Sequence, residues 1–413
     1  MNTNLKRVRR VGVRFPSWIS FHTGLFKGIL NYMRLHEMWQ LELPQDTDDE
    51  MERVVIDKNW DGDGLLLFRY TPEEAEAFQR RGVCVVNLSA ECADGPFPSV
   101  LPDNVRAGRE AARHLLALGL QKFAFLGRRG DVVRRYSLER AEGFCKEIEA
   151  AGREVSVTQL KFVRDGRDRL DTVAFNREIV AALQSLPAGT GIFAADDLLA
   201  ANVLRVCRSM GLVVPGHFAV IGFNNEELFC HTTLPPLSSV SYPGEAIGFR
   251  AAEILGRLFA GEKMPGHEWR ISVMGYAERE STNILAVTAP RVADAVRIIR
   301  NRAPTYPLRV NELLEQLDVS YSGLNKLFSA ALNTTPKQEI NRVRLETFRR
   351  LLATTDWTTE RIADHMHFES AEDARRFFRR ESGVSASDFR REHQVLGPLQ
   401  ATRKVRRPGA ESA

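Results

Sequence analysis

One stretch near the C-terminal end of the chain specifies a local fold by itself: residues 359–385, TERIADHMHFESAEDARRFFRRESGVS. Residues 359–366 have the pattern of an amphipathic helix, and Phe368-Glu369-Ser370 follows as a short turn. A second helical pattern comes next, in which Phe377 and Phe378 are expected to face the interior. The stretch therefore predicts two short helices joined by a tight turn, which is a helix-turn-helix unit.

A matching unit lies earlier in the chain. Residues 310–317 predict its first helix and residues 318–320 its turn, in which Ser320 is a favourable N-cap. The inner face of the following helix is expected to consist of Leu324, Leu327 and Phe328. A solvated amphipathic helix pair would explain one such unit, but two in succession favour a dedicated function.

That function is indicated by the outward face of the second helix in each unit. Arg and Asn side chains can pair with base edges in a major groove, and Lys can pair with phosphates. The residues that we predict to contact DNA are Ser322, Asn325, Lys326, Ser329, Glu372, Arg375, Arg376 and Arg379.

Charge distribution agrees with a polyanionic partner for this part of the chain. Residues 290–413 hold 22 Lys and Arg against 16 Asp and Glu, whereas residues 1–289 hold 35 against 37. Strand-like runs are absent after about residue 286, so we predict an all-α DNA-binding domain over residues 290–394. Residues 395–413 are expected to form a flexible basic tail.

The C-terminal pattern resembles the arabinose-regulator (AraC/XylS) family of transcription factors over residues 290–393. Ile362-Ala363-x-x-x-x-Phe368 and Gly383-Val384-Ser385 carry the resemblance in the second unit. Three positions depart from the family pattern. His367 replaces the usual Gly, Ala386 replaces the usual Pro, and Ala374 lies where an aromatic residue or Leu is common.

Residues 8–285 show a different pattern, in which apolar runs alternate with amphipathic helical segments. Repeated strand–helix–strand segments indicate parallel sheets with helices on both faces, and the length indicates two lobes. The predicted strands are Val11–Phe15, Gly64–Phe68, Val83–Asn87, Lys122–Leu126, Gly191–Ala195 and Phe218–Phe223.

Signatures of enzymes, metal sites and membrane proteins are absent from the sequence. It has no GxGxxG after a strand, no Walker loop, no HExxH and no GxSxG. Its 9 histidines have no metal-ligand spacing, and its 5 cysteines form no CxxC pair, as in a reduced cytosolic protein. No signal-peptide core and no apolar run long enough to span a membrane is present. We therefore expect a cytoplasmic protein that is not an enzyme and needs no cofactor or metal.

The N-terminal region resembles the LacI/GalR-type periplasmic-binding-protein fold used by sugar-sensing repressors. Six segments carry the resemblance by their order and spacing, although each alone is a weak signal. They are Val11-Gly-Val13, the Asp103–Gly108 segment with His114–Gly119, Phe123–Gly127, Ser137–Phe144, Gly191–Ala200, and Val220–Asn225 running on to Val240.

The resemblance implies a ligand pocket built from loops at the carboxyl ends of the strands, facing a cleft between the lobes. Such a site satisfies the hydroxyls of a polyol with carboxylates, amides and Arg, and stacks an aromatic ring on its apolar face. It implies that Arg140 points inward, and that Asn224 stands where an Asp is usual. The implied ligand-binding residues are Ser17, Trp18, Ser20, Arg69, Asp103, Arg140, Asp196, Asn224 and Tyr242.

Several of these residues have an alternative role. Asp103 can cap its helix, Trp18 can pack at the hinge, and Arg140 can pair with Glu139 or Glu142 on the surface. Asp197 is expected to stabilise the first turn of its own helix. We expect a solvated loop to contain Arg128, Arg129, Arg134 and Arg135.

Together these patterns predict a ligand-responsive transcription regulator that binds double-stranded DNA, as a homodimer, and controls carbohydrate-utilisation genes. The expected effector is a sugar or sugar-like molecule, either neutral or, given Arg69, carrying a carboxylate or phosphate. RNA polymerase would be a further partner if the protein is an activator; activation and repression both remain open. Two alternatives are an enzyme fused to a DNA-binding tail and a DNA-binding protein that ignores ligand.

Overall fold

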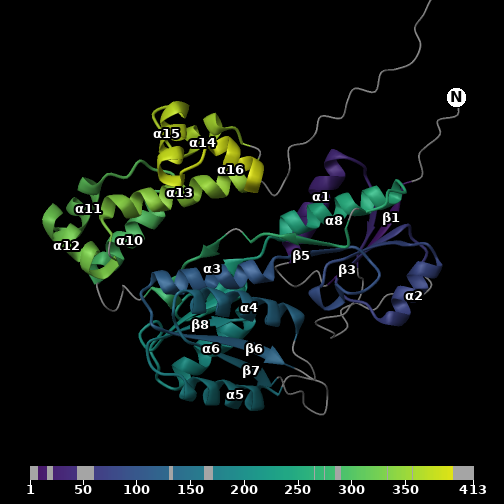
Figure 1. Cartoon of the computed structure of the whole chain (residues 1–413), viewed down its shortest axis with the longest axis horizontal. Coiled ribbons are helices and arrows are strands. Elements are labelled where there is room, and N and C mark those ends of the chain that lie inside the picture. Colours follow the sequence, from purple (N-terminus) through teal and green to yellow (C-terminus); the bar gives the residue numbers. More distant parts are fainter. Residues whose placement is uncertain are drawn as a thin grey trace, which may run out of the picture. The chain divides into compact units, whose positions relative to one another are not determined.

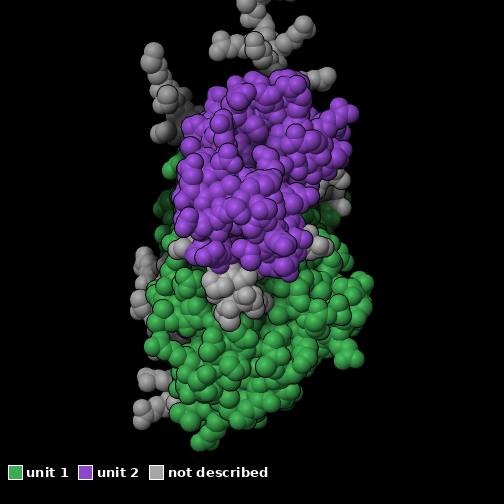
Figure 2. All heavy atoms as spheres, turned by 90° about the vertical axis from the view of Figure 1, so that its left-hand side faces the viewer, with its two compact units in different colours: residues 1–287 green, residues 288–413 purple. Residues whose placement is uncertain are grey.

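Two six-stranded sheets form the core of the N-terminal part of the chain (Figure 1). The computed structural model describes residues 8–15, 22–43, 60–129, 134–161, 171–264, 266–273, 275–283, 290–332, 334–355 and 357–393. The chain divides into two units, Met1–Val287 and Thr288–Ala413 (Figure 2). The predicted ligand-binding residues Ser17, Trp18 and Ser20 lie outside the described residues.

The first lobe of the N-terminal unit is a parallel sheet with strand order β11-β5-β4-β3-β1-β2. Alternate residues of the strands face opposite layers: Leu66 packs with helices α1 and α8, whereas Leu65 and Leu67 pack beneath α2. The strands are β1 (Arg10–Arg14), β2 (Gln40–Glu42), β3 (Gly64–Leu67), β4 (Cys84–Asn87), β5 (Ser99–Pro102) and β11 (Glu268–Ile271). The helices are α1 (His22–Leu35), α2 (Pro72–Arg80), η1 (Ala90–Cys92) and α8 (Gly244–Phe259).

The second lobe has strand order β12-β10-β9-β8-β6-β7, with only β12 antiparallel to its neighbour. Helices α3 and α4 cover one face of this sheet, and α5 and α6 cover the other, as the alternating pattern predicted (Figure 1). The strands are β6 (Lys122–Arg129), β7 (Val155–Lys161), β8 (Thr190–Ala194), β9 (Phe218–Asn224), β10 (Ser238–Ser241) and β12 (Tyr276–Ala277). The helices are α3 (Asn104–Ala117), α4 (Arg135–Ala150), α5 (Thr172–Ser185), α6 (Asp197–Ser209), α7 (Glu227–Thr232) and η2 (Glu280–Thr282).

The chain passes between the two lobes three times. It does so between β5 and α3, between β10 and α8, and between β11 and β12. Asp103 lies at the first passage and Tyr242 at the second. Two of the predicted ligand-binding residues are therefore placed where the lobes join.

Close packing of α3 against α4 depends on two glycines, which belong to two of the segments that indicated the family. A Cβ on Gly108 would lie 2.1 Å from the carbonyl oxygen of Arg140, and one on Gly143 would lie 1.9 Å from that of Val105. Any larger side chain would push the helices apart. This contact fixes the position of α4, which carries Arg140.

The C-terminal unit is helical in its described residues. The two predicted helix pairs are present, as α11 (Val310–Leu317) with α12 (Tyr321–Leu332) and α14 (Thr359–His365) with α15 (Ala371–Ser382). The other helices of this unit are α10 (Pro290–Arg302), α13 (Pro336–Thr354) and α16 (Ala386–His393). The pairs α11–α12 and α14–α15 form the two helix-turn-helix units, and α13 contacts helices of both. Phe348, Phe377 and Phe378 lie in the core of the second unit. Leu327 was predicted to lie on the inner face of α12, but 36% of the residue is exposed, so that prediction is wrong.

Arg344 on α13 ties the segment between α10 and α11 to the end of α14 from inside the fold. Its guanidinium donates to the carbonyl oxygens of Tyr306 and Met366, each at 2.9 Å, and lies 4.4 Å from the centre of the Phe368 ring. Burial lowers its pKa. The carbonyl acceptors, which come from segments on either side of α13, replace the water that the buried charge has lost.

Candidate functional site

Four predicted ligand-binding residues gather at one edge of the second-lobe sheet, where the carboxyl ends of its parallel strands meet. Asp196 follows β8, Asn224 ends β9 and Tyr242 follows β10. Arg140 reaches this edge from α4 and donates to the carbonyl oxygen of Ala195 at 2.5 Å. We call this group, with Asp103, the candidate effector site.

Arg140 is the most buried charge of the site. Only 5% of the residue is exposed. The central carbon of its guanidinium lies 3.5 Å from the centre of the Phe223 ring and 4.7 Å from the centre of the Tyr136 ring. Its Nε donates to Asn104 Oδ1 at 3.0 Å. Burial lowers its pKa to about 10, because the charged form has lost water. The alternative of a surface pair with Glu139 or Glu142 is therefore wrong.

Asp196 has two partners. Its Oδ1 accepts from the backbone N–H of Leu199 at 2.9 Å and caps α6, and its Oδ2 accepts from Arg128 at 2.5 Å. Burial alone would lower the pKa of Arg128, but the Asp196 carboxylate raises it above its usual value. We expected Arg128 to lie in a solvated loop, but only 18% of its side chain is exposed, so this expectation is wrong.

Asp197 lies in the first turn of α6, as expected, and also has partners outside its helix. It is fully buried, and its carboxylate accepts from Ser239 Oγ at 2.6 Å and from the N–H of Glu226 at 2.8 Å. Burial raises its pKa to about 7. Asp197 therefore holds the segment that follows β9 close to β10, while the neighbouring Asp196 caps α6.

The other predicted ligand-binding residues that the structure describes are half-buried, namely Arg69, Asp103, Asn224 and Tyr242. Asp103 is the N-cap of α3 and accepts from the N–H of Arg106 at 2.9 Å, so it has its expected capping role. Asn224 has a φ of 122°, an unusual backbone conformation for a residue with a side chain. Burial raises the pKa of Tyr242. Arg69 follows β3 in the other lobe, 6.0 Å from the centre of the Phe68 ring.

Two residues of this site were missed in the sequence. Arg128 stands at the carboxyl end of β6, so the same positional rule that selected Arg69 and Asp196 would have selected it. Asn104 directly follows Asp103 and is fully buried beside Arg140. Its role could not be predicted, because it depends on how α3 docks against α4.

The predicted DNA-binding residues occupy the outward faces of α12 and α15. All of them are exposed except Asn325, which is half-buried. Two of the arginines are held by acidic side chains: Arg375 pairs with Glu360, and Arg376 pairs with Asp373 at 2.5 Å. These exposed pairs are weak, so a phosphate or a base edge can replace the carboxylate.

Neither a membrane span nor a metal site is found in the described residues. None of the described helices is both long and apolar enough to cross a membrane. The described side chains include no group of three or more His, Cys, Asp or Glu that could hold a metal ion.

Family models match both parts of the chain. A periplasmic binding protein-like domain matches residues 112–282, and a helix-turn-helix domain matches residues 313–392. The predicted combination of these two folds is thereby confirmed. A sensor fold joined to this DNA-binding module defines the class of ligand-responsive transcription regulators.

Within this class the chain is similar to xylose operon regulatory proteins over nearly its whole length. It is 27% identical to that of Escherichia coli strain K12 over 387 residues, which cover 92% of this chain and 96% of the relative. It is 29% identical to that of Haemophilus influenzae over 332 residues, covering 79% and 84%. The solved structure of a xylose-binding transcription activator, 25% identical, superposes with a TM-score of 0.57 and covers 94% of this chain and 99% of that one.

Proposed function

We propose that the protein senses a sugar or sugar-like molecule in the cytoplasm and controls transcription of carbohydrate-utilisation genes, without enzymatic activity. The observation that carries the proposal is the buried, oriented guanidinium of Arg140 at the carboxyl edge of the sheet, flanked by the aromatic rings of Tyr136 and Phe223. Polar groups of this kind bind hydroxyls, while the rings offer an apolar surface to a sugar ring. The similarity to xylose operon regulatory proteins supports a sugar over other small molecules.

The proposed switch uses the two lobes and the C-terminal unit. An effector that binds differently to open and closed lobes shifts the population between them. In a homodimer this shift would change how two C-terminal units meet DNA. Recruitment of RNA polymerase would follow if the protein is an activator.

The effector is best identified by thermal shift of the full chain with pentoses, hexoses, sugar acids and sugar phosphates. A molecule present at a hundred times its dissociation constant should stabilise the protein by about 2.7 kcal/mol. Arg140→Leu should abolish this stabilisation. Arg113→Gln is a matched control, because Arg113 pairs with Glu147 at 2.7 Å on the same two helices, α3 and α4, away from the site. Equal stabilisation of wild type and Arg140→Leu would refute the proposed site.

The charge of the effector can be tested at Arg69. A carboxylate or phosphate effector could form charge-assisted hydrogen bonds with the guanidinium groups of Arg69 and Arg140. Calorimetric titration of D-xylose and D-xylonate, repeated with Arg69→Gln, separates the two cases. Tighter binding of the acid that Arg69→Gln removes would support an anionic effector. Tight binding of the neutral sugar that is unchanged by salt and by Arg69→Gln would exclude it.

The two alternative functions have their own tests. Conversion of any bound sugar or sugar phosphate by the purified protein would favour the fused enzyme. DNA binding that is identical with and without a saturating effector would favour a ligand-independent DNA-binding protein.

A further inference from the structure

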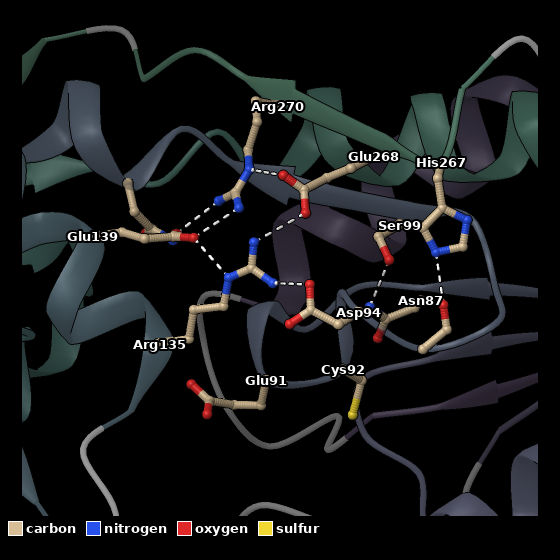
Figure 3. Close-up of polar contacts among 12 residues, drawn as sticks. Asn87, Glu91, Cys92, Asp94, Ser99, Arg135, Glu139, His267, Glu268 and Arg270 are labelled. Atoms are coloured by element: carbon tan, nitrogen blue, oxygen red, sulfur yellow. Dashed lines mark hydrogen bonds and ion pairs between the residues drawn. The ribbon is translucent and has the colours of Figure 1, made fainter.

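A network of ion pairs joins the two lobes beside the candidate effector site (Figure 3). Arg270 on β11 of the first lobe donates two hydrogen bonds, both of 2.7 Å, to the carboxylate of Glu139 on α4 of the second lobe. Arg135, also on α4, donates to Asp94 at 3.0 Å and to Glu268 at 3.3 Å, both in the first lobe. We call these five residues the interlobe latch. Arg135 is thus an ion-pairing residue of the latch and not part of a solvated loop.

The latch differs from ordinary surface ion pairs in two respects. Its carboxylate at the centre, Glu139, is only 14% exposed at the side chain, and Arg135 also contacts it at 2.9 Å. The bonds from Arg270 are bidentate, a geometry that gives strength and a fixed orientation. Burial by itself would raise the pKa of Glu139, but the hydrogen bonds from Arg270 and Asn104 hold it below its usual value. The carboxylate is therefore charged while the lobes are in contact.

Asn104 connects the latch to the candidate effector site. Its Nδ2 donates to Glu139 Oε2 at 2.8 Å, and its Oδ1 accepts from Arg140 Nε at 3.0 Å. The residue is fully buried and starts α3, directly after the first passage between the lobes. An amide can satisfy both neighbours at once only in this orientation, since one end donates and the other accepts. Asn104 thus fixes the position of the Arg140 guanidinium relative to the Glu139 carboxylate, which binds Arg270 of the first lobe.

We propose that Asn104 is a positioning residue that couples effector binding at Arg140 to closure of the two lobes through the interlobe latch. This inference rests on the proposed effector site. Coupling between two sites is reciprocal, so a latch that is strengthened by the effector must itself strengthen effector binding by the same factor. Removing the latch should therefore weaken effector binding, although none of the five latch residues belongs to the candidate effector site.

The first measurement follows the lobes without any effector. Fluorophores placed through non-natural amino acids at Gln79 on α2 and Arg177 on α5, both exposed, report the interlobe distance by single-molecule energy transfer in the full chain. Arg270→Gln should shift the distribution toward longer distances. Raising the salt to about 1 M should shift wild type in the same direction, because screening weakens ion pairs. The variant should shift less, because only the interlobe pairs of Arg135 remain in it. An unchanged distribution in Arg270→Gln would overturn the proposal.

The second measurement tests the coupling by calorimetric titration with the sugar that stabilises wild type most in the thermal-shift screen. Arg270→Gln and Asn104→Ala should each weaken binding by about fivefold or more, and the double variant should bind no more weakly than the weaker single variant. Arg113→Gln should bind like wild type. Additive losses, or wild-type affinity in Arg270→Gln, would overturn the role of Asn104.

Asn104→Asp keeps the test decisive if Asn104→Ala does not fold. The carboxylate still accepts from Arg140, but it cannot donate to Glu139 and repels the Glu139 carboxylate, so the link to the latch is broken. The interlobe distance should then lengthen as in Arg270→Gln, and an unchanged distance would contradict the proposal. If no sugar binds to wild type, the proposed function fails, while the distance measurements still decide whether the latch closes the lobes.

Discussion

His367 occupies a backbone position that suits glycine, and replacing it should stabilise the C-terminal unit. Its φ is 52°, in the left-handed region, directly after the end of α14. The N–H of His367 donates to the carbonyl of Asp364 at 3.1 Å, and that of Phe368 donates to the carbonyl of Ala363 at 2.9 Å. This pair of bonds is a Schellman motif, whose left-handed residue is usually Gly. The motif also explains why the related family pattern has Gly there.

The change in unfolding free energy that His367→Gly causes is the difference between two opposing effects. A left-handed conformation costs an L-residue roughly 1–2 kcal/mol, which His367→Gly removes. Glycine gains flexibility in the unfolded chain, which offsets about 0.4–1 kcal/mol of this. The imidazole is exposed, so little packing is lost. We expect a net stabilisation of about 0.5–1 kcal/mol, or a rise of about 2–6 °C in the melting temperature of this unit.

Differential scanning calorimetry of the full chain measures this change, in the transition that shifts when DNA is added. His367→Ala is the matched control, because it removes the same imidazole but keeps a Cβ in the left-handed conformation. Only the glycine variant should be stabilised. Equal stabilisation of both variants, or none in His367→Gly, would show that the backbone of His367 is not strained.

Three further predictions concern other parts of the molecule. Because burial raises the pKa of Asp197 from its usual 3.8 to about 7, the stability that its protonated carboxyl contributes is present at low pH and is lost as the pH rises through 7. Asp197→Asn should therefore flatten the dependence of unfolding free energy on pH between about 4 and 7, and an unchanged slope in urea titrations would contradict this. Arg344→Met should destabilise the C-terminal unit by about 3 kcal/mol, since it leaves buried carbonyls without a donor, and a loss below about 0.5 kcal/mol by calorimetry would argue against its role. Lys326→Ala and Arg376→Ala should weaken binding to a DNA site selected with the wild-type protein, by about 1–3 kcal/mol for each base contact that is lost. Both variants should still bind the effector. Wild-type DNA affinity of both variants in gel-shift titrations would refute the assigned DNA-contacting faces.

The sequence predicted the long, periodic elements well and the short strands poorly. The helices of the C-terminal unit were found because each combines a regular apolar stripe with a clear start or stop signal. Strands β5 and β10 were missed, since a four-residue strand in which at least three residues are buried has no periodicity that separates it from a loop. Strand β7 was also missed, because it lies at the edge of its sheet and most of its residues are at least partly exposed.

The candidate site shows the same division. The inward direction of Arg140 could be predicted from its sequence segment, because the fold places that helix turn against the sheet. The bond between Asn104 and Glu139 could not, since the two residues are far apart in sequence and meet only when α3 docks on α4. Expectations about charge failed for a related reason. Arg128 and Arg135 lie in an Arg-rich segment that looks solvated, yet each meets an acidic partner from a distant part of the chain.

Arg344 has a consequence for the kind of DNA that the C-terminal unit accepts. One buried side chain bonds both to the segment that leads into the first helix-turn-helix unit and to the end of α14 in the second. The separation of the two recognition helices, α12 and α15, therefore cannot adjust freely to the duplex. If the spacing of two successive major-groove segments differs from the spacing of the two recognition helices, the duplex must deform, because the protein cannot. The elastic cost of bending then depends on base steps that no side chain touches, so operator choice should extend to the flexibility of the spacer sequence.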